Sequence, residues 1–205
     1  MSVRSAILSD LKILERLVAE DDKCIFVSPL IDPSTEIGPS SLDVRLGTEL
    51  VITRTTSSTH IDLTVSKGEV ERQVKEYSAH WRVRPEDTFV LHPGEFALAE
   101  TLEFIRLPRD IAARLEGRSS VGRLGLQVHA TAGFVDPGFE GVLTFELINS
   151  GRLPVRLRPG IRLGQLCFFH VDDVQVPYGD RPSNKYGGRL GVELTKIYED
   201  PEIPE

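Results

Sequence analysis

Cysteine, tryptophan and methionine are all scarce in this chain of 205 residues, which has two, one and one of them respectively. The two cysteines, Cys24 and Cys167, lie far apart in apolar runs, so we expect buried, reduced thiols. One class of water-activating enzymes holds its zinc with a His or Cys near a Glu and a later Cys-x-x-Cys pair. That pair is absent and the five histidines are scattered. We therefore expect no protein-held zinc and no metal ligands among the side chains.

Long apolar runs are missing as well. None approaches the roughly 18 residues of a membrane-spanning helix, and the first ten residues, MSVRSAILSD, lack the core of a signal peptide. We expect a cytoplasmic protein with no membrane partner. An excess of positive charge is also absent, because the net charge is −7, which argues against binding to nucleic-acid polymers. Arg114, Arg118 and Arg123 do cluster, so a small polyanion can still find a positive pocket.

Short segments of strand-forming residues recur along the chain, separated by Gly, Pro, Asn or Asp. We predict strands at 24–27, 42–46, 49–53, 89–91, 96–102, around 105, and at 111–115, 126–130, 142–148, 155–157 and 164–169. Residues 92–95 (HPGE) predict a hairpin turn between two of them. Many short strands with regular turn signals indicate an all-β sandwich or barrel. The length is most simply that of one domain, 1–205.

Four segments fall outside this strand pattern. Within residues 1–22, Ser9 or Asp10 can cap a helix with apolar residues at helical spacing (Leu11, Leu14, Leu17 and Val18). Residues 31–41 contain two prolines and a glycine and predict a loop. Residues 54–88 are polar and predict an insertion or arm with one or two strands. The C-terminal tail, 178–205, is polar and contains glycine, so we expect it to be mobile.

One acidic residue stands inside an apolar strand candidate. Glu146 lies between Phe145 and Leu147, so by alternation it faces away from both, toward either solvent or a pocket. A glutamate in an apolar pocket can shuttle protons near neutral pH. No serine occurs in a nucleophile-elbow pattern, which leaves a triad hydrolase unsupported.

A second candidate feature is the run Gly117–Ser120, between apolar segments. It predicts either a plain turn before a short helix or a phosphate-binding loop. Arginine beside two hydroxyl groups, with free N–H groups at a helix start, suits a phosphate. A turn, Asp136-Pro137-Gly138, separates this run from the strand that carries Glu146.

Together these residues resemble the dCTP deaminase branch of the dUTPase superfamily, over most of the chain from Gly38 to Gly191. The specific motifs are EGRSSVGRLGL (116–126), TAGFVDPGFEG (131–141), FEL (145–147) and RPGIRLGQL (158–166). Weaker similarities are GPSSLDVRLG (38–47) and KYGG (185–188). The resemblance implies a distorted β-barrel or jelly-roll, a homotrimer with sites between subunits, dCTP and dUTP as ligands, and Mg²⁺ carried by the nucleotide phosphates.

The resemblance also implies roles for single residues. Glu146 matches the catalytic glutamate and Asp136 the aspartate that holds the deoxyribose 3′-hydroxyl. The motif from the neighbouring subunit matches Arg118, Ser119, Ser120 and Arg123, of which Ser119 and Arg123 are expected to assist catalysis. Tyr178 and Lys185 match tail residues that contact the triphosphate. The remaining substrate contacts are expected at Ala132, Thr144, Phe145 and Arg189; at the last of these positions the family pattern usually has glutamine.

The implied activity is deamination of dCTP to dUTP with release of ammonia, in pyrimidine deoxynucleotide metabolism. Glu146 would take a proton from water and pass it on without zinc. Two alternatives are a dUTPase without deaminase activity and a non-catalytic nucleotide-binding β-sandwich; neither needs Glu146. Gly133-Phe134 resembles the turn of the dUMP-forming members, which leaves open a further step from dUTP to dUMP and pyrophosphate.

Overall fold

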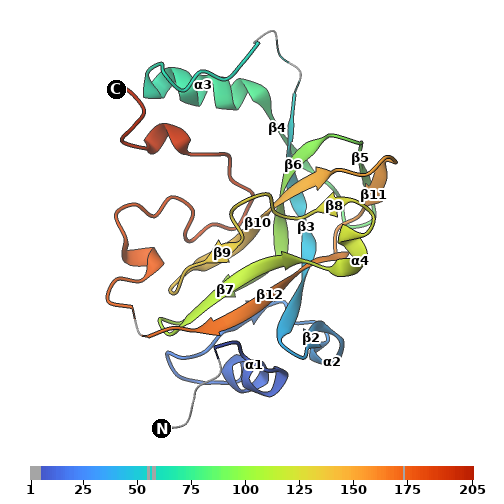
Figure 1. The fold of residues 1–205 in the computed structure, drawn as a ribbon, viewed down its shortest axis with the longest axis vertical. Helices are drawn as coiled ribbons and strands as arrows, with labels where there is room; N and C mark the ends of the chain where they lie inside the picture. Colours follow the sequence, from blue (N-terminus) through green and yellow to red (C-terminus); the bar gives the residue numbers. More distant parts are fainter. Residues whose placement is uncertain (1–5, 55, 57–58, 173) are drawn as a thin grey trace.

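The structure is a computed structural model that describes residues 6–54, 56, 59–172 and 174–205 (Figure 1). In this described part, ten antiparallel strands form one sheet, and a further two form a small one. The large sheet has the order β8-β10-β6-β3-β12-β7-β9, with β1 beside β6 and both β2 and β4 beside β3. Its strands are β1 (Phe26–Ser28), β2 (Ile37–Gly38), β3 (Ser41–Thr53), β4 (Ser78–Arg82), β6 (Phe96–Arg106), β7 (Ile111–Gly117), β8 (Leu126–Gln127), β9 (Phe134–Val135), β10 (Glu140–Asn149) and β12 (Arg162–His170).

The long strand β3 belongs to both halves of this sheet. Its first residues pair with β12, whereas its later residues pair with β4 and β6. The register with β6 shifts between Leu46 and Leu50, where Gly47 leaves room for a neighbouring side chain. A Cβ at Gly47 would lie 2.4 Å from Cγ of Glu100. The sheet therefore curls at this irregularity, as β-bulges commonly cause.

The two halves of the curled sheet pack face to face around the main hydrophobic core. Phe145 on β10 and Phe168 on β12 are fully buried there. A Cβ at Gly164 of β12 would lie 2.8 Å from the Phe145 ring, so β12 and β10 meet at this glycine. The expected distorted barrel or jelly-roll is confirmed by this arrangement.

The hairpin predicted around residues 92–95 is only half right. The turn is present, because Glu95 N donates to His92 O over 3.0 Å and Gly94 has a φ of 80°. However, β5 (Phe89–Leu91) pairs with β11 (Val155–Leu157) in the small sheet, while β6 pairs with β10, β3 and β1. Local residues specify a turn, but the partners of its two strands depend on the packing of distant segments.

Helix α1 (Asp10–Leu17) is confirmed, but its predicted apolar face is only partly right, since Leu17 packs against the core and two other members do not. Ile13 is the buried residue, whereas Leu11 and Val18 are 72% and 75% exposed. The predicted loop at 31–41 contains a short helix, α2 (Pro33–Glu36), and β2. Both cysteines are free thiols, as expected, although each is half-buried rather than fully buried.

The arm at 54–88 contains one of the predicted strands, β4, and a helix that the prediction missed, α3 (Lys67–Tyr77). Only Val70 and Val74 give this helix a buried face, while ion pairs such as Arg72–Glu69 cover its outer surface. The two valines pack with Ile203 from the C-terminal segment, which contains two short 3₁₀ turns, η1 (Tyr178–Asp180) and η2 (Ile197–Glu199).

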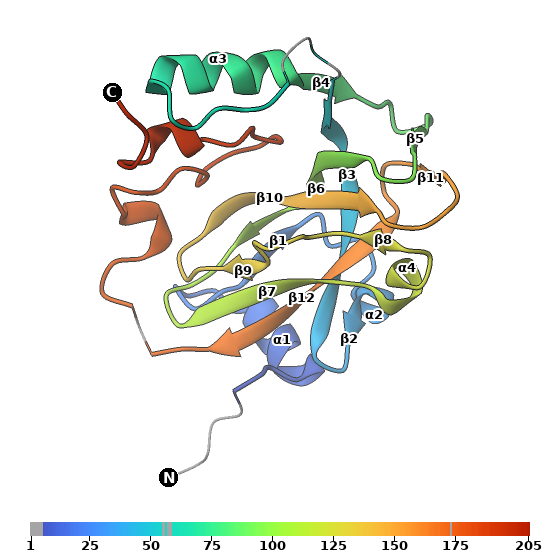
Figure 2. The same cartoon turned by 45° about the horizontal axis from the view of Figure 1, so that its top comes forward.

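This C-terminal segment (orange to red) runs beside the sheet and reaches α3 (Figure 1). In Figures 1 and 2 it lies at the opposite end of the sheet from helix α4 (Ser119–Gly122). The short helix expected after Ser120 is thus confirmed as α4. Mobility of the tail stays a prediction.

Candidate active site

Strand β10 directs Glu146 away from the core. Phe145 and Leu147 are fully buried on one face, and Glu146 is half-buried on the other, as strand alternation predicts. Its backbone N donates to Val128 O over 2.9 Å. Its carboxylate Oε2 accepts hydrogen bonds from the backbone N of Ala130 (2.6 Å) and Thr131 (3.1 Å). Because both bonds use Oε2, Oε1 is the oxygen left for a ligand.

Glu146 lines a cavity of about 470 Å³ that is mostly apolar. Of the predicted site residues, it brings together Glu146, Ala132, Asp136, Thr144 and Tyr178. The walls come from β3, α3, β4, β6, β10, the loop through β9 and the C-terminal segment. A mostly apolar cavity with a few converging polar groups is the usual form of a small-molecule site.

The turn that carries Asp136 supports the tail. Phe139 N donates to Asp136 O over 3.1 Å, and Gly138 has a φ of 78°, which favours glycine. A Cβ at Gly138 would lie 2.3 Å from Cβ of Pro177, so the tail lies directly on this turn. Tyr178 N donates to Pro137 O over 2.9 Å. Burial raises the pKa of the Tyr178 phenol, which keeps it a neutral hydrogen-bond donor at neutral pH.

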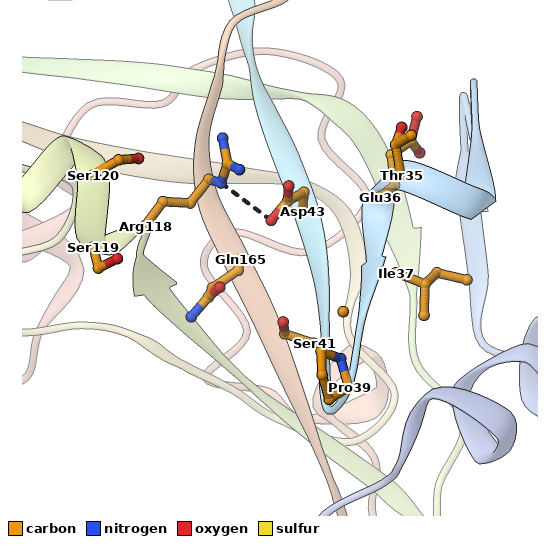
Figure 3. Close-up of a pocket in the computed structure, with 11 residues that line it drawn as sticks. Thr35, Glu36, Ile37, Pro39, Ser41, Asp43, Arg118, Ser119, Ser120 and Gln165 are labelled. Atoms are coloured by element: carbon orange, nitrogen blue, oxygen red, sulfur yellow. Dashed lines mark ion pairs between the residues drawn. The ribbon is translucent and has the colours of Figure 1, made fainter.

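The Gly117–Ser120 motif lies elsewhere in the chain. Arg118 is the N-cap of α4, and Arg118, Ser119 and Ser120 line a separate, polar cavity of about 340 Å³ (Figure 3). Arg123 follows α4 and is exposed. Among the described residues that line the Glu146 cavity, none belongs to this motif. One chain therefore keeps the two groups of predicted site residues apart.

The predicted tail cations contact other tail residues. Lys185 pairs with Asp200 and donates to Lys196 O over 3.2 Å. Arg189 is exposed and lies 3.6 Å from Glu193. The tail backbone lies along the edge of β10 here and pairs with it: Gly188 N donates to Glu140 O (2.7 Å), and Val142 N donates to Arg189 O (3.1 Å).

Comparison with known proteins then decides the family. A family model described as dCTP deaminase-like matches residues 7–171. The chain belongs to this family. It is 42% identical to a dCTP deaminase of Natronomonas pharaonis over 198 residues, 96% of this chain and 97% of the relative. It is 46% identical over 172 residues to a dUMP-forming dCTP deaminase of Streptomyces avermitilis, covering 82% of this chain and 86% of that one.

Another relative, from Halobacterium salinarum, is a dUMP-forming dCTP deaminase that is 42% identical over 96% of this chain and 97% of its own length. The fold matches the crystal structure of the dCTP deaminase from Agrobacterium tumefaciens, with a TM-score of 0.60 and 23% identity. That match covers 81% of this chain but only 48% of the longer neighbour. The family resemblance seen in the sequence is thereby confirmed.

Phe145 and Arg189 also lie outside the cavity of Glu146, in addition to Lys185 and the motif residues Arg118, Ser119, Ser120 and Arg123. Phe145 is fully buried in the core behind the cavity, so only its backbone is available to a ligand there. Arg189 does not line the cavity, although its neighbour Tyr186 does. The substrate-binding roles of both residues stay predictions.

Several residues that line the cavity were not predicted. Tyr77 comes from the end of α3, and Tyr186, Glu193 and Thr195 come from the tail. Tyr186 lies in the KYGG similarity but was given no role, and nothing in the immediate sequence marks the other three. Leu194, between Glu193 and Thr195, packs against α3, which brings this part of the tail to the cavity. Phe134, which is 63% exposed, also lines it; the sequence had marked this residue only for the choice of product.

Membrane-spanning helices and metal-binding clusters are both absent from the described residues. Within residues 6–54, 56, 59–172 and 174–205, helices are too short or too polar to cross a bilayer. In the same residues no three His, Cys, Asp or Glu side chains are grouped closely enough to hold a metal ion.

Proposed function

We propose that this chain deaminates dCTP, replacing the C4 amine of cytosine by oxygen and releasing ammonia. The observation that carries the proposal is the carboxylate of Glu146, held by two backbone N–H groups at the wall of the 470 Å³ cavity. The family assignment and the names of the relatives support the substrate.

The chemistry needs one water and two proton transfers. Glu146 accepts a proton from the water as its oxygen bonds to C4 and delivers this proton to N3; it then carries the proton of the new C4 hydroxyl to the departing amine. The C4–N bond then breaks, and ammonia leaves as the C4 carbonyl forms. The fixed position of Oε2 orients Oε1 toward the water, so the base needs little reorganisation.

Asp136 and Tyr178 are proposed to bind the sugar and the phosphate end of the nucleotide. Both line the cavity, and the phenol of Tyr178 stays protonated because burial raises its pKa. Asp136 accepts a hydrogen bond from the deoxyribose 3′-hydroxyl in this proposal. Thr144 lies two residues before Glu146 on the same face of β10 and contacts the base.

We further propose a homotrimer in which Arg118, Ser119, Ser120 and Arg123 of one subunit complete the cavity of the next. The support is their separation within one chain: the first three line another cavity, and Arg123 lines neither. Ser119 and Arg123 would then supply the donors that orient the water and stabilise developing charge. A cyclic assembly of identical chains repeats this contact at every interface.

Mg²⁺ is proposed to enter on the nucleotide phosphates. An ion of this kind is held mainly by phosphate and water oxygens and needs few ligands from the protein. Neutralising phosphate charge is the chemistry that Mg²⁺ supplies; the protein residues position the sugar, the base and the water.

A second proposed activity follows deamination: hydrolysis of dUTP to dUMP and pyrophosphate. The relatives from Streptomyces avermitilis and Halobacterium salinarum that are named dUMP-forming favour it. The deciding experiment for the function as a whole is incubation of the purified chain with dCTP and Mg²⁺, measuring ammonia and nucleotides. Absence of ammonia from a folded, nucleotide-binding protein would overturn deamination.

A further inference from the structure

We infer that Asp43 is a positioning residue that fixes the guanidinium of Arg118 in the second cavity. The inference rests on the proposed function, in which Arg118 of one subunit helps to complete the nucleotide site of the next, and it adds that Arg118 binds a phosphate group there. Figure 3 shows the Arg118 side chain crossing strand β12 toward Asp43 on β3. Nε of Arg118 lies 3.3 Å from Oδ1 of Asp43.

The sheet topology brings these two residues together. Strands β3, β12 and β7 are neighbours, and Gln165 of β12 is in register with Asp43 on one side and Glu116 on the other. Arg118 follows Glu116 by two residues. Its backbone N donates to Leu163 O over 3.1 Å, which fixes the point from which the side chain crosses β12.

Asp43 contacts a second arginine as well. Nη1 of Arg162 lies 3.3 Å from Oδ2 of Asp43 and also donates to Thr35 O over 2.7 Å. Each carboxylate oxygen therefore faces a different guanidinium. The Asp43 side chain is 12% exposed, whereas those of Arg118 and Arg162 are 32% and 33% exposed. The carboxylate is more enclosed than either arginine. Its negative charge offsets the repulsion between the guanidinium groups of Arg118 and Arg162.

The contacts select which edge of Arg118 faces a ligand. Nε is directed at Asp43 and Nη1 donates to Arg162 O over 3.5 Å. A guanidinium has five N–H donors in a fixed fork, so its Nη2 group is left for the cavity. Ser119 and Ser120 line the same 340 Å³ cavity and add hydroxyl donors. This donor set suits the oxygens of a nucleotide phosphate, and its geometry depends on Asp43.

A role of Asp43 in positioning and a purely electrostatic role predict opposite effects of its removal on phosphate binding, which allows a sharp test. The substitution Asp43→Asn keeps the shape but raises the local charge by one, which by itself would attract phosphate more strongly. If Asp43 positions Arg118, the same variant weakens phosphate binding because the guanidinium is no longer fixed. We expect KM for dCTP to rise about tenfold, with a smaller change in kcat.

A double-mutant cycle tests whether Asp43 acts through Arg118. The variants are Asp43→Asn, Arg118→Ala and both together, each compared with the wild type in KM for dCTP. We expect the double variant to match Arg118→Ala alone, because Asp43 has nothing left to position. Additive effects, or an unchanged or lower KM for Asp43→Asn, would overturn the inference.

Matched controls separate positioning from stability. Asp110 is as enclosed as Asp43, with its side chain 11% exposed, and it pairs with Arg16 away from both cavities. We expect Asp110→Asn to lower the melting temperature but not to change KM. Asp43→Glu keeps the charge on a longer side chain, and we expect KM to rise only about threefold. If Asp43→Asn does not fold, the cycle with Asp43→Glu and Arg118→Ala decides.

Failure of the proposed function has a different signature. It shows as a wild-type protein that releases no ammonia from dCTP. In that case the same cycle is measured by equilibrium binding of dCTP with Mg²⁺. A non-additive loss of binding then supports the role of Asp43, and an additive loss or none contradicts it.

Discussion

Oε2 of Glu146 lies 2.6 Å from the backbone N of Ala130, which donates a hydrogen bond to it. The next backbone N, that of Thr131, donates to the same oxygen. The loop after β8 therefore fixes the carboxylate on β10 before any ligand binds. Since Ala132 follows in the same loop and lines the cavity, one short segment both orients the proposed base and forms part of the binding wall.

This geometry makes Glu146→Gln an informative variant. The amide oxygen of glutamine can accept both hydrogen bonds from the loop, so the cavity should keep its shape. Glutamine cannot accept the proton from water, so we expect the rate of ammonia release from dCTP to fall by about 10²–10⁴. Equilibrium binding of dCTP should change by less than about threefold.

The matched control for this change is Glu140→Gln. Glu140 is exposed at the start of the same strand and its side chain does not line the cavity. We expect the Glu140→Gln variant to release ammonia from dCTP at the same rate as the wild type. Ammonia release by Glu146→Gln at the wild-type rate would show that another group is the base.

The proposed trimer predicts complementation between inactive subunits. Arg118→Ala and Glu146→Gln proteins, each with only residual activity alone, should recover activity when they are unfolded together, mixed in equal amounts and refolded. A site shared between two chains is intact in about a quarter of the interfaces of a random trimer, so about a quarter of the wild-type rate is expected. Mixed trimers without activity would indicate that each site lies within one chain.

The sequence predicted those parts of the molecule that depend on neighbouring residues. Alternation around Glu146 correctly placed Phe145 and Leu147 in the core, and the Asp136-Pro137-Gly138 turn formed as expected. Residues with similarity to a known family also identified five members of the main cavity. Each of these features can be predicted from a local signal: the alternation of a strand, the residues of a turn, or a short motif.

Features that depend on distant packing were missed. Helix α3 has only Val70 and Val74 on its buried face, too few to give a clear period, and it is stabilised by contact with Ile203 some 130 positions later. Glu193 lines the cavity beside Leu194, which packs against the same cluster. The apolar side of α1 was partly misplaced because the helix buries Ile13, while Leu11 stays exposed.

Buried Glu100 predicts a dependence of stability on pH. Burial raises the pKa of this carboxyl, although Thr48 N and Glu49 N both donate to its Oε1. A raised folded-state pKa means that the folded protein keeps the proton to higher pH than the unfolded chain does. Its stabilising contribution is complete below the unfolded pKa and is lost as the pH rises through the folded pKa.

The variant Glu100→Gln removes this titration and keeps an oxygen for both N–H groups. We therefore expect its free energy of unfolding, relative to the wild type, to increase as the pH rises from about 4 to about 7.5. Urea unfolding at a series of pH values measures this. Parallel curves for the two proteins would contradict the prediction.

The C-terminal segment should open when its anchor on α3 is removed. Ile203 is buried beside Val70 and Val74, and Pro204 O accepts a hydrogen bond from Lys67 N. We expect Ile203→Ser to increase proteolytic cleavage within residues 178–196 by about tenfold, because local opening becomes easier. Leu190→Ser is the matched control, since this tail residue is 77% exposed.

Binding of nucleotide should lower the rate of proteolytic cleavage of the tail in the wild type. If Lys185 and its neighbours close over the phosphates, a non-hydrolysable dCTP analogue with Mg²⁺ slows cleavage of the same residues. A cleavage rate that is the same with and without the analogue would count against closure of the tail.

The final prediction concerns the product. Gly133 precedes Phe134 in the loop beside the cavity, and a Cβ at Gly133 would lie 2.9 Å from Leu115 O. Only glycine lets this loop pack so closely on β7, where Leu115 N also donates to Gly133 O over 2.7 Å. We expect this close packing to leave space near Asp136 for a second water, which the Asp136 carboxylate would activate. We therefore expect dCTP to yield dUMP and pyrophosphate, with little free dUTP.

A time course of ammonia, dUTP, dUMP and pyrophosphate tests this directly. Asp136→Asn should slow pyrophosphate release more than ammonia release, because only the second reaction needs its carboxylate to activate water. Asp180→Asn, an exposed change in the tail, is the control and should leave the product ratio unchanged. Stoichiometric dUTP without pyrophosphate from the wild type would restrict the enzyme to deamination. Equal slowing of both steps by Asp136→Asn would instead assign Asp136 to binding of the sugar alone.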